Sequence, residues 1–252
     1  APPTGRHVLD GFFGFLAALG LHERVLDWSV PVPQSVQAAA ARRLPEGPPW
    51  LLISPCSSHP RRDWLASRYA AVADHAAGAL GMRVALIGGR SARERKAGKA
   101  IRAAASCEIH DLIGDAPLEM LLGLLQRGAA LLTPDAGPAH MGNAAGIPVI
   151  GLHAATECAR SGPYSSLRWC VDRYDAAARG FLKRPAAKLS WGTKIERRGV
   201  MELIAVADVI ERLDAVMKQN PARTAGVSPA CEQDGAVPSS QHPLTATASP
   251  DR

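Results

Sequence analysis

The feature that most constrains this fold is a strand, a turn, a helix and a second strand in quick succession between residues 129 and 150. Ala129 to Thr133 is an apolar run of buried-strand length, and Pro134 to Pro138 has the composition of a tight turn. Gly146 then ends the helix, and a second apolar run follows Pro148. This pattern predicts a βαβ corner in a Rossmann-like parallel sheet with flanking helices.

The turn of this corner carries polar residues at the carboxyl end of a predicted strand, where parallel α/β sheets bind their ligands. These residues are Asp135, Gly137 and His140. The N–H groups of the first helical turn carry partial positive charge and would face a diphosphate. One alternative is that Asp135 only caps the helix, as aspartate often does, and that His140 is an ordinary helix residue.

A second strand end upstream has the chemistry of a phosphate site. Trp50 to Pro55 is a short apolar strand, and it leads into a loop at residues 56–64 that is rich in hydroxyls and cations. Small hydroxyl side chains and backbone N–H groups can approach phosphate oxygens closely, and a guanidinium can bridge two of them. Alternatively, paired arginines before a helix are simply solvated.

The next segments repeat the same alternation. Leu65 to Leu80 has helical spacing, Arg83 to Gly89 is another buried strand, and a helix with Glu94 near its start follows. A strand at Leu112 to Gly114 and a helix at Pro117 to Gln126 continue toward the acidic corner. The dinucleotide fingerprint G-x-G-x-x-G does not occur after these strands.

Taken in order, these segments resemble the C-terminal half of the family-9 glycosyltransferases, the heptosyltransferases of lipopolysaccharide synthesis. The resemblance spans roughly residues 50–217 and is carried by an ordered set of motifs: Ser57-Ser58 with Arg62-x-Trp64, Leu86-Ile87-Gly88-Gly89 with Glu94, Leu112-Ile113-Gly114 with Leu118-Glu119, Asp135-Ala136-Gly137-Pro138-Ala139-His140, and Ser161-Gly162-Pro163-Tyr164. It implies a GT-B glycosyltransferase, in which two Rossmann-like domains face each other and the C-terminal one holds the nucleotide-sugar donor.

The resemblance also implies roles for single residues. Ser57, Ser58 and Arg62 would contact the donor diphosphate, and Glu94 would lie near the nucleoside. The corner formed by Asp135, Ala136, Gly137 and His140 would hold the sugar and the diphosphate. The implied activity is transfer of heptose from ADP-heptose to a lipopolysaccharide inner-core acceptor.

Three positions depart from the family pattern. The family usually has Lys where Arg62 stands and Ser or Thr where Ala136 stands, so one hydroxyl is absent here. Glu94 is displaced by a residue or two from the usual glutamate. The catalytic aspartate of the family lies in the N-terminal domain, so we assign no catalytic residue in this chain.

We expect three parts along the chain. Residues 1–49 would be a remnant of the N-terminal domain, namely a helix near Gly11 to Gly20, and a Pro-rich linker from Asp27 to Pro49. Residues 50–217 would form the nucleotide-sugar-binding domain, ending in an amphipathic helix from Ala207 to Met217 with an apolar face left bare for the other domain. Residues 218–252 have no apolar period and would be disordered. On this interpretation the chain is a fragment.

The composition limits the classes of binding partner that we expect. A formal net charge of +6 with a pI near 9.3 admits nucleic acid, an anionic membrane surface or a phosphorylated ligand. Six basic residues crowd one predicted helix, most simply as a solvated face: Arg90, Arg93, Arg95, Lys96, Lys99 and Arg102. No nucleic-acid motif accompanies them, so we expect no nucleic-acid partner.

Five scattered cysteines without C-x-x-C spacing argue against a disulfide framework or a zinc site and favour a reducing cytoplasm. No apolar stretch reaches the roughly 20 residues that span a bilayer. The lipid-linked acceptor adds an expectation of peripheral association with the inner membrane. With no D-x-D pair, we expect neither a metal nor a cofactor.

Two alternatives to an active transferase remain open at the level of the sequence. The chain could hold a nucleotide sugar without turning it over, as a non-catalytic binding module. It could instead be a basic Rossmann-like domain that binds another phosphorylated partner, including nucleic acid. Salt-sensitive polynucleotide binding would separate the last class from the others.

Overall fold

Six parallel strands form a single sheet in the order β3-β2-β1-β4-β5-β6 in the computed structural model, which describes residues 7–28 and 30–220. The strands are β1 (Trp50–Ile53), β2 (Arg83–Gly88), β3 (Ile109–Ile113), β4 (Ala130–Pro134), β5 (Val149–His153) and β6 (Val171–Asp172). The chain builds outward from β1 in one direction and then from β4 in the other. The predicted parallel α/β fold is confirmed.

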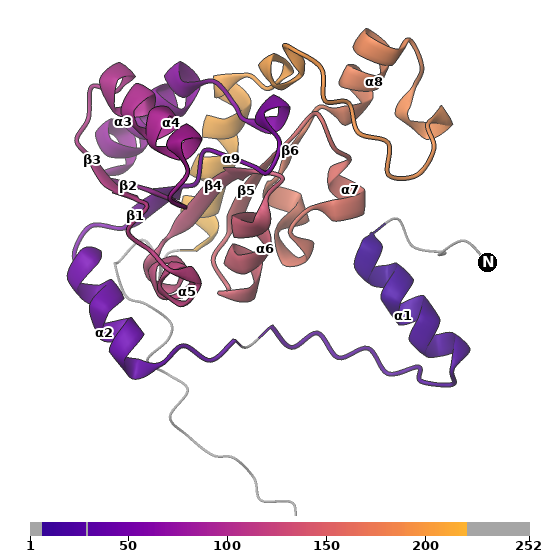
Figure 1. Ribbon diagram of the computed structural model, residues 1–252, viewed down its shortest axis with the longest axis horizontal. Coiled ribbons are helices and arrows are strands. Elements are labelled where there is room, and N and C mark those ends of the chain that lie inside the picture. The colour runs from indigo at the N-terminus through magenta and orange to yellow at the C-terminus, as the bar shows by residue number, and fades with distance from the viewer. Residues whose placement is uncertain (1–6, 29, 221–252) are drawn as a thin grey trace, which may run out of the picture.

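Helices cover both faces of this sheet (Figure 1). The helices of the described residues are α1 (Val8–Ala18), α2 (Gln34–Arg43), α3 (Ala66–Leu80), α4 (Ala92–Ala104), α5 (Leu118–Arg127), α6 (Gly137–Ala144), α7 (Cys158–Ser161), α8 (Tyr174–Leu182) and α9 (Val206–Gln219), and all but α1 lie against the sheet or its edges. Four short 3₁₀ turns lie between them, at Pro60–Arg62, Tyr164–Trp169, Ala186–Lys188 and Val200–Leu203. The helix and strand boundaries agree with the sequence pattern to within a few residues through β5.

Alternate residues of the strands feed two separate apolar clusters. Leu51 and Ile53 of β1 pack with α3, α4, α8 and α9 on one face. Leu52 of the same strand packs with α2, α5 and α6 on the other face. Because both faces are covered, β1, β2, β4 and β5 are buried along nearly their whole length, which explains why they appear in the sequence as continuous apolar runs, whereas the edge strand β3 is partly exposed.

The Pro-rich stretch from Asp27 to Pro49 is not a linker throughout. Residues 34–43 form α2, which lies against α5 and contributes Ala40 to the core, where Leu44 directly after the helix is also buried. Gly123 permits this close packing, since a Cβ there would lie 3.2 Å from side-chain atoms of Val36 and Ala40. The prolines lie outside the helix, and the small residues within the helix make its packing contacts.

The C-terminal helix also differs from expectation, because its apolar face is covered. Val209, Leu213 and Val216 of α9 are fully buried in the cluster that includes α3. The helix with uncovered apolar side chains is α1, where Phe12 is 59% exposed and Phe15 is 72% exposed. An amphipathic stripe in the sequence predicts that one face of a helix is buried, but it does not identify the packing partner.

Helix α1 lies beside the end of the domain near α7 rather than on the sheet (Figure 1). Its preceding residue His7 contacts the Gly162 carbonyl through Nε2 at 2.9 Å, and Tyr164 donates a hydrogen bond of 3.0 Å to Asp10. The predicted helix is therefore present, attached by polar contacts. Most of the tail, residues 221–252, lies outside the described residues, so its expected disorder stays a prediction.

Helix α6 depends on Gly142 for its position over the sheet. A Cβ at this residue would lie 2.8 Å from Leu131 Cδ2 and 3.0 Å from Val149 Cγ2. Gly142→Ala should therefore lower the free energy of unfolding by about 1–3 kcal/mol, measured by urea denaturation. Gly78→Ala is the matched control, because its Cβ would meet no atom within 4 Å, and it should stabilise by about 0.5–1 kcal/mol. Equal effects of both variants would contradict this packing.

Candidate functional site

The carboxyl ends of β2, β1 and β4 lie side by side, because these strands are consecutive in the sheet. Between β1 and β4 the chain reverses the direction in which strands are added. Such a switch point leaves a crevice outside the strand ends, which is where open α/β sheets bind ligands. The loop after β1, the start of α4 and the start of α6 all meet there, so the topology brings the predicted segments together.

Arg62 spans this switch point. Its Nε and Nη2 atoms donate to Oε1 of Glu196 at 2.9 and 2.7 Å, and its Nη1 lies 3.8 Å from Oδ2 of Asp135. The Arg62 side chain is only 11% exposed, and that of Asp135 is 12% exposed. One guanidinium thus links the loop after β1, the corner after β4 and a segment far along the chain.

The loop that carries Ser57 is held by internal hydrogen bonds. The Ser57 N–H donates to Asp63 at 2.8 Å, and the Ser57 hydroxyl donates to the His59 carbonyl at 2.8 Å. Arg93 of α4 donates to the Ser57 carbonyl and lies 3.2 Å from Asp63. The Ser57 groups are therefore engaged within the loop, whereas Ser58 is exposed.

Burial raises the pKa of the Asp63 carboxyl, against the opposing effects of the Ser57 N–H and the nearby Arg93 charge. Asp63 acts as the organising acceptor of this loop. Neither Asp63 nor Arg93 stood out as a site residue in the sequence, because a single charge in a mixed-charge loop gives no pattern.

Glu94 lies at the third position of α4 and closes a capping box with Ser91. Its carboxylate accepts hydrogen bonds from the Gly89 N–H at 2.7 Å and from the Ser91 hydroxyl at 2.6 Å. Burial alone would raise the pKa of Glu94, but these hydrogen bonds outweigh it and lower the pKa. Glu94 thus lies near the start of the helix after β2, as expected, and its carboxylate is oriented toward the N-terminus of that helix.

The corner after β4 does not use Asp135 as a helix cap. Ala136 is the N-cap residue of α6 and makes no side-chain capping bond, so the Asp135 carboxylate is directed to Arg62 instead. The first turn offers fewer N–H donors than expected, since Pro138 has none and the Ala139 N–H donates to the Ala136 carbonyl. Gly137 is exposed, and a Cβ built on it would meet nothing within 4 Å, so the corner is open there.

His140 lies on the next turn of α6 and is exposed. Desolvation by the surrounding protein lowers the pKa of its imidazole from the ordinary 6.5, against the opposing influence of the Asp135 carboxylate. The ring is therefore mainly neutral at neutral pH and offers one donor and one acceptor to a ligand.

Glu196 is the partner of Arg62 that the sequence did not reveal. The two residues are 134 positions apart, and no local spacing connects them. His59 lies 3.6 Å from the second Glu196 oxygen, which makes Glu196 a shared partner of two loop residues. The Arg62 charge is accordingly surrounded by two carboxylates, and any anionic ligand must compete with them.

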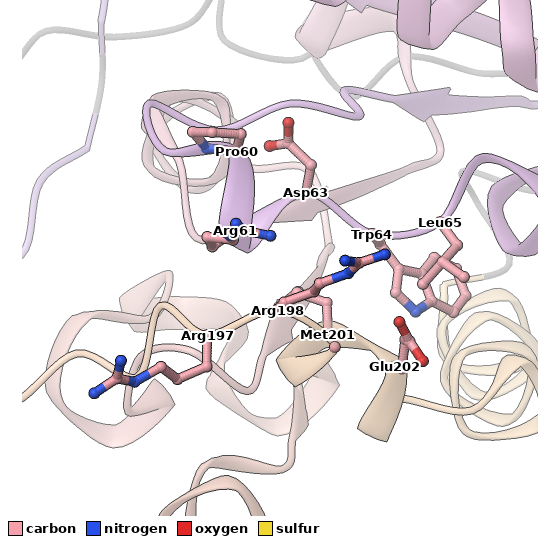
Figure 2. A pocket seen from close by; sticks show the side chains of 10 residues that line it. Pro60, Arg61, Asp63, Trp64, Leu65, Arg197, Arg198, Met201 and Glu202 are labelled. Atoms are coloured by element: carbon pink, nitrogen blue, oxygen red, sulfur yellow. The ribbon is translucent and has the colours of Figure 1, made fainter. Parts of the chain in front are cut away.

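A pocket lies beside the Pro60–Arg62 turn and is lined by Arg61, Trp64, Arg198 and Glu202 among others (Figure 2). Figure 2 shows Arg198 extending toward Trp64, while Arg197 points the opposite way. Arg61 thus lies at this pocket, whereas Arg62 lies at the switch point. Arg61 is exposed and provides a natural comparison for Arg62.

Two expectations about other groups can be compared with the structure. The basic helix is solvated in part: Arg95, Lys96 and Lys99 are exposed, while Arg93 reaches the loop after β1. The cysteines are not merely scattered, because Cys158 and Cys170 meet at a buried point together with a histidine. Spacing rules miss this cluster, since its members come from separate elements.

The strand order, with its topological switch between β1 and β4, is that of a Rossmann-like α/β domain. The chain matches the family model "Glycosyltransferase family 9 (heptosyltransferase)" over residues 1–187, and it belongs to that family. It is 32% identical over 211 residues to the lipopolysaccharide core heptosyltransferase OpsX of Haemophilus influenzae, covering 84% of this chain and 60% of that protein.

Two solved structures share the fold. The family-9 glycosyltransferase of Veillonella parvula DSM 2008 matches with a TM-score of 0.69 and 19% identity, over 87% of this chain and 62% of that one. The ADP-heptose lps heptosyltransferase II of E. coli matches with a TM-score of 0.59 and 20% identity, over 77% of this chain and 54% of that one. The expected fold class, that of GT-B glycosyltransferases, is confirmed.

The Arg62–Glu196 pair should contribute more to stability than an ordinary surface pair, because it is partly buried and doubly hydrogen-bonded. A double-mutant cycle with Arg62→Ala and Glu196→Ala should give a coupling energy of about 1–2 kcal/mol in urea unfolding. The exposed pair Arg179 and Asp175, 2.7 Å apart, is the control and should give about 0.5 kcal/mol or less. A coupling no larger than the control would show that the switch point is not held by this pair.

Proposed function

We propose that this chain provides the donor-binding half of a heptosyltransferase, which moves heptose from ADP-heptose to a lipopolysaccharide inner-core acceptor. The observation that carries the proposal is Arg62, held at the β1/β4 switch point opposite the open corner at Gly137. Family membership supports the reaction class. The chain spans 60% of the length of the curated relative that it matches, so the complete reaction is part of the proposal.

The donor diphosphate would bind Arg62 by replacing part of its interactions with Glu196 and Asp135. Arg62 has five N–H donors in a fixed planar arrangement, and the bonds to Glu196 use its Nε and Nη2 atoms. A diphosphate at Gly137 would approach from the side of Nη1 and Asp135. His140 and Ser58 would complete the polar surroundings, with Glu94 nearer the nucleoside.

The carboxylates set the strength of this binding. Asp135 and Glu196 hold Arg62 in position before the donor arrives, which reduces the cost of ordering the side chain. Their negative charge also opposes the diphosphate. Removing the Glu196 charge alone should therefore tighten nucleotide binding and lower the free energy of unfolding.

The leaving ADP would be stabilised by fixed protein charge. As the bond between the sugar and the diphosphate breaks, negative charge grows on the phosphate oxygens, and a guanidinium placed there in advance stabilises it. Arg62 and the terminus of α6 fill this role in the proposal. The catalytic base that deprotonates the acceptor would come from the N-terminal domain, as the family resemblance implies.

Helix α1 fits an attachment to such a domain. Phe12 and Phe15 are exposed on it, and Leu19 directly after it is 77% exposed. Apolar side chains of this number on one short helix are covered in most proteins. We assign residues 7–28 to the N-terminal domain of the GT-B fold. We assign α2 to the donor-binding domain.

The proposed setting is the cytoplasm, with peripheral association at the inner membrane where the acceptor is anchored. No helix among residues 7–28 and 30–220 is long and apolar enough to cross a bilayer. The solvated cations of α4 suit attraction to an anionic membrane surface. Polynucleotide is not a proposed partner.

The proposed function makes two predictions, and the first concerns the ligand and its independence of metal. The 252-residue chain should bind ADP in the presence of EDTA, because Arg62 and the α6 terminus supply the positive charge. Isothermal titration calorimetry with and without Mg²⁺ measures this. An absolute requirement for Mg²⁺ would contradict the site, and salt-sensitive binding of polynucleotide in preference to ADP would favour the other class of phosphorylated partner.

The second prediction separates Arg62 from its neighbour. Arg62→Ala should weaken ADP binding by about 1.5–3 kcal/mol, the range for hydrogen bonds to charged groups. Arg61→Ala removes the same charge one residue earlier and should cost less than about 0.5 kcal/mol. Glu196→Gln should tighten binding. Equal losses for the two arginine variants would show that only net charge matters.

A further inference from the structure

We propose that His153, Cys158 and Cys170 form a buried binding site for a zinc-type divalent metal ion, separate from the donor site. His153 is the last residue of β5, Cys158 is the first of α7, and Cys170 directly precedes β6. Three elements that the sequence spaces irregularly thus converge on one point. The site rests on these side chains and does not depend on the proposed transferase reaction.

The spacing of the ligand atoms fits a small metal ion. One ligand atom from each of the three residues lies within 4.8 Å of the others. Zinc binds thiolate sulfur at about 2.3 Å and imidazole nitrogen at about 2.0–2.1 Å, so tetrahedral ligand atoms lie roughly 3.5–3.8 Å apart. Closing from the observed spacing to that range requires only small side-chain movements.

The three side chains are buried, and one polar atom among them is unpartnered. His153 is 0% exposed, Cys158 4% and Cys170 7%. His153 Nε2 is buried and has no hydrogen-bond partner among the described residues. Leaving such an atom unsatisfied costs about 1–3 kcal/mol, and coordination to a metal would remove that cost.

The neighbour of the other ring nitrogen is compatible with the tautomer that binds metal. The Thr156 hydroxyl lies 3.4 Å from His153 Nδ1 and can accept a hydrogen bond from it. With the proton on Nδ1, Nε2 presents its lone pair to the cluster. A hydrogen-bond partner on the second ring nitrogen is typical of metal-bound histidine.

Two glycines leave the room that the ligand atoms occupy. A Cβ on Gly151 would lie 2.8 Å from Cys170 Sγ and 3.0 Å from His153 Nε2. A Cβ on Gly162 would lie 2.8 Å from Cys158 Sγ. Any larger residue at either position would push a ligand atom out of place, so both glycines border the proposed site.

The charges balance when the ion binds. A divalent cation bound by two thiolates and one neutral imidazole has no net charge, which makes its burial acceptable. Binding releases one proton from Cys158 and one from Cys170, and two metal–sulfur bonds and one metal–nitrogen bond form. A water molecule would fill the fourth position of the ion, as in zinc sites with three protein ligands.

The ion would connect the end of β5, α7 and the start of β6. The segment between His153 and Cys170 contains Gly162 and Tyr164, which contact His7 and Asp10 at the α1 end. Metal binding would therefore fix the segment that attaches α1. The expected effect is structural, and it lies in thermal stability rather than in affinity for ADP.

The test uses the full 252-residue chain, reduced and freed of metal. Co²⁺ should produce a thiolate-to-cobalt charge-transfer absorption and tetrahedral visible bands, and Zn²⁺ should displace it. After dialysis the chain should retain one Zn²⁺, measured by atomic emission, with a raised melting temperature. Cys170→Ser should lose the retained ion and the shift.

Cys107→Ser is the matched control, because it removes a partly buried thiol outside the cluster and leaves Cys56 and Cys231 in both variants. It should retain the ion and the Co²⁺ spectrum. Retention of Zn²⁺ by Cys170→Ser would overturn the proposal. If Cys170→Ser does not fold, the wild-type spectrum decides: folded, reduced chain without a thiolate-to-cobalt band would overturn the site.

Discussion

The guanidinium of Arg62 is the contact on which the candidate site depends. It joins the loop after β1 to Asp135 at the end of β4 and to Glu196, which comes 134 residues later in the chain. Without it, the carboxylates of Asp135 and Glu196 would lack their shared positive partner. The switch point would then carry negative charge where the proposed diphosphate needs positive charge. In the proposed function, the diphosphate would therefore bind by exchanging one partner of the Arg62 side chain for another.

The sheet supports this contact through packing that leaves little freedom. Strands buried on both faces fix where β1 and β4 end, and Gly142 lets α6 lie close enough to bring its first turn beside the loop after β1. Asp63 and Arg93 then brace that loop from the α4 side. The packed core therefore fixes the strand ends, and the strand ends fix the positions of the site residues at the surface.

The sequence predicts the repeating elements well, because β1, β2, β4 and β5 are apolar runs and each connecting helix has its own turn residues, while only the apolar end of β3 is evident. It fails where burial is decided by distant partners. Helix α2 lies inside a proline-rich stretch and packs through small residues, and α9 covers its apolar face with α3. Glu196 and the His153, Cys158 and Cys170 cluster are likewise products of tertiary structure, with no local pattern to reveal them. Asp135 carries a cap-like sequence context, yet its carboxylate pairs with Arg62.

The most direct measurement of the central claim is a crystal structure of the chain with ADP bound. The diphosphate should lie at the β1/β4 switch point, with oxygens within hydrogen-bond distance of Arg62 and of the Gly137 N–H. Glu196 should have given up at least one of its two bonds to Arg62. A diphosphate found in the pocket between Arg61 and Arg198, with the Arg62–Glu196 pair unchanged, would contradict it.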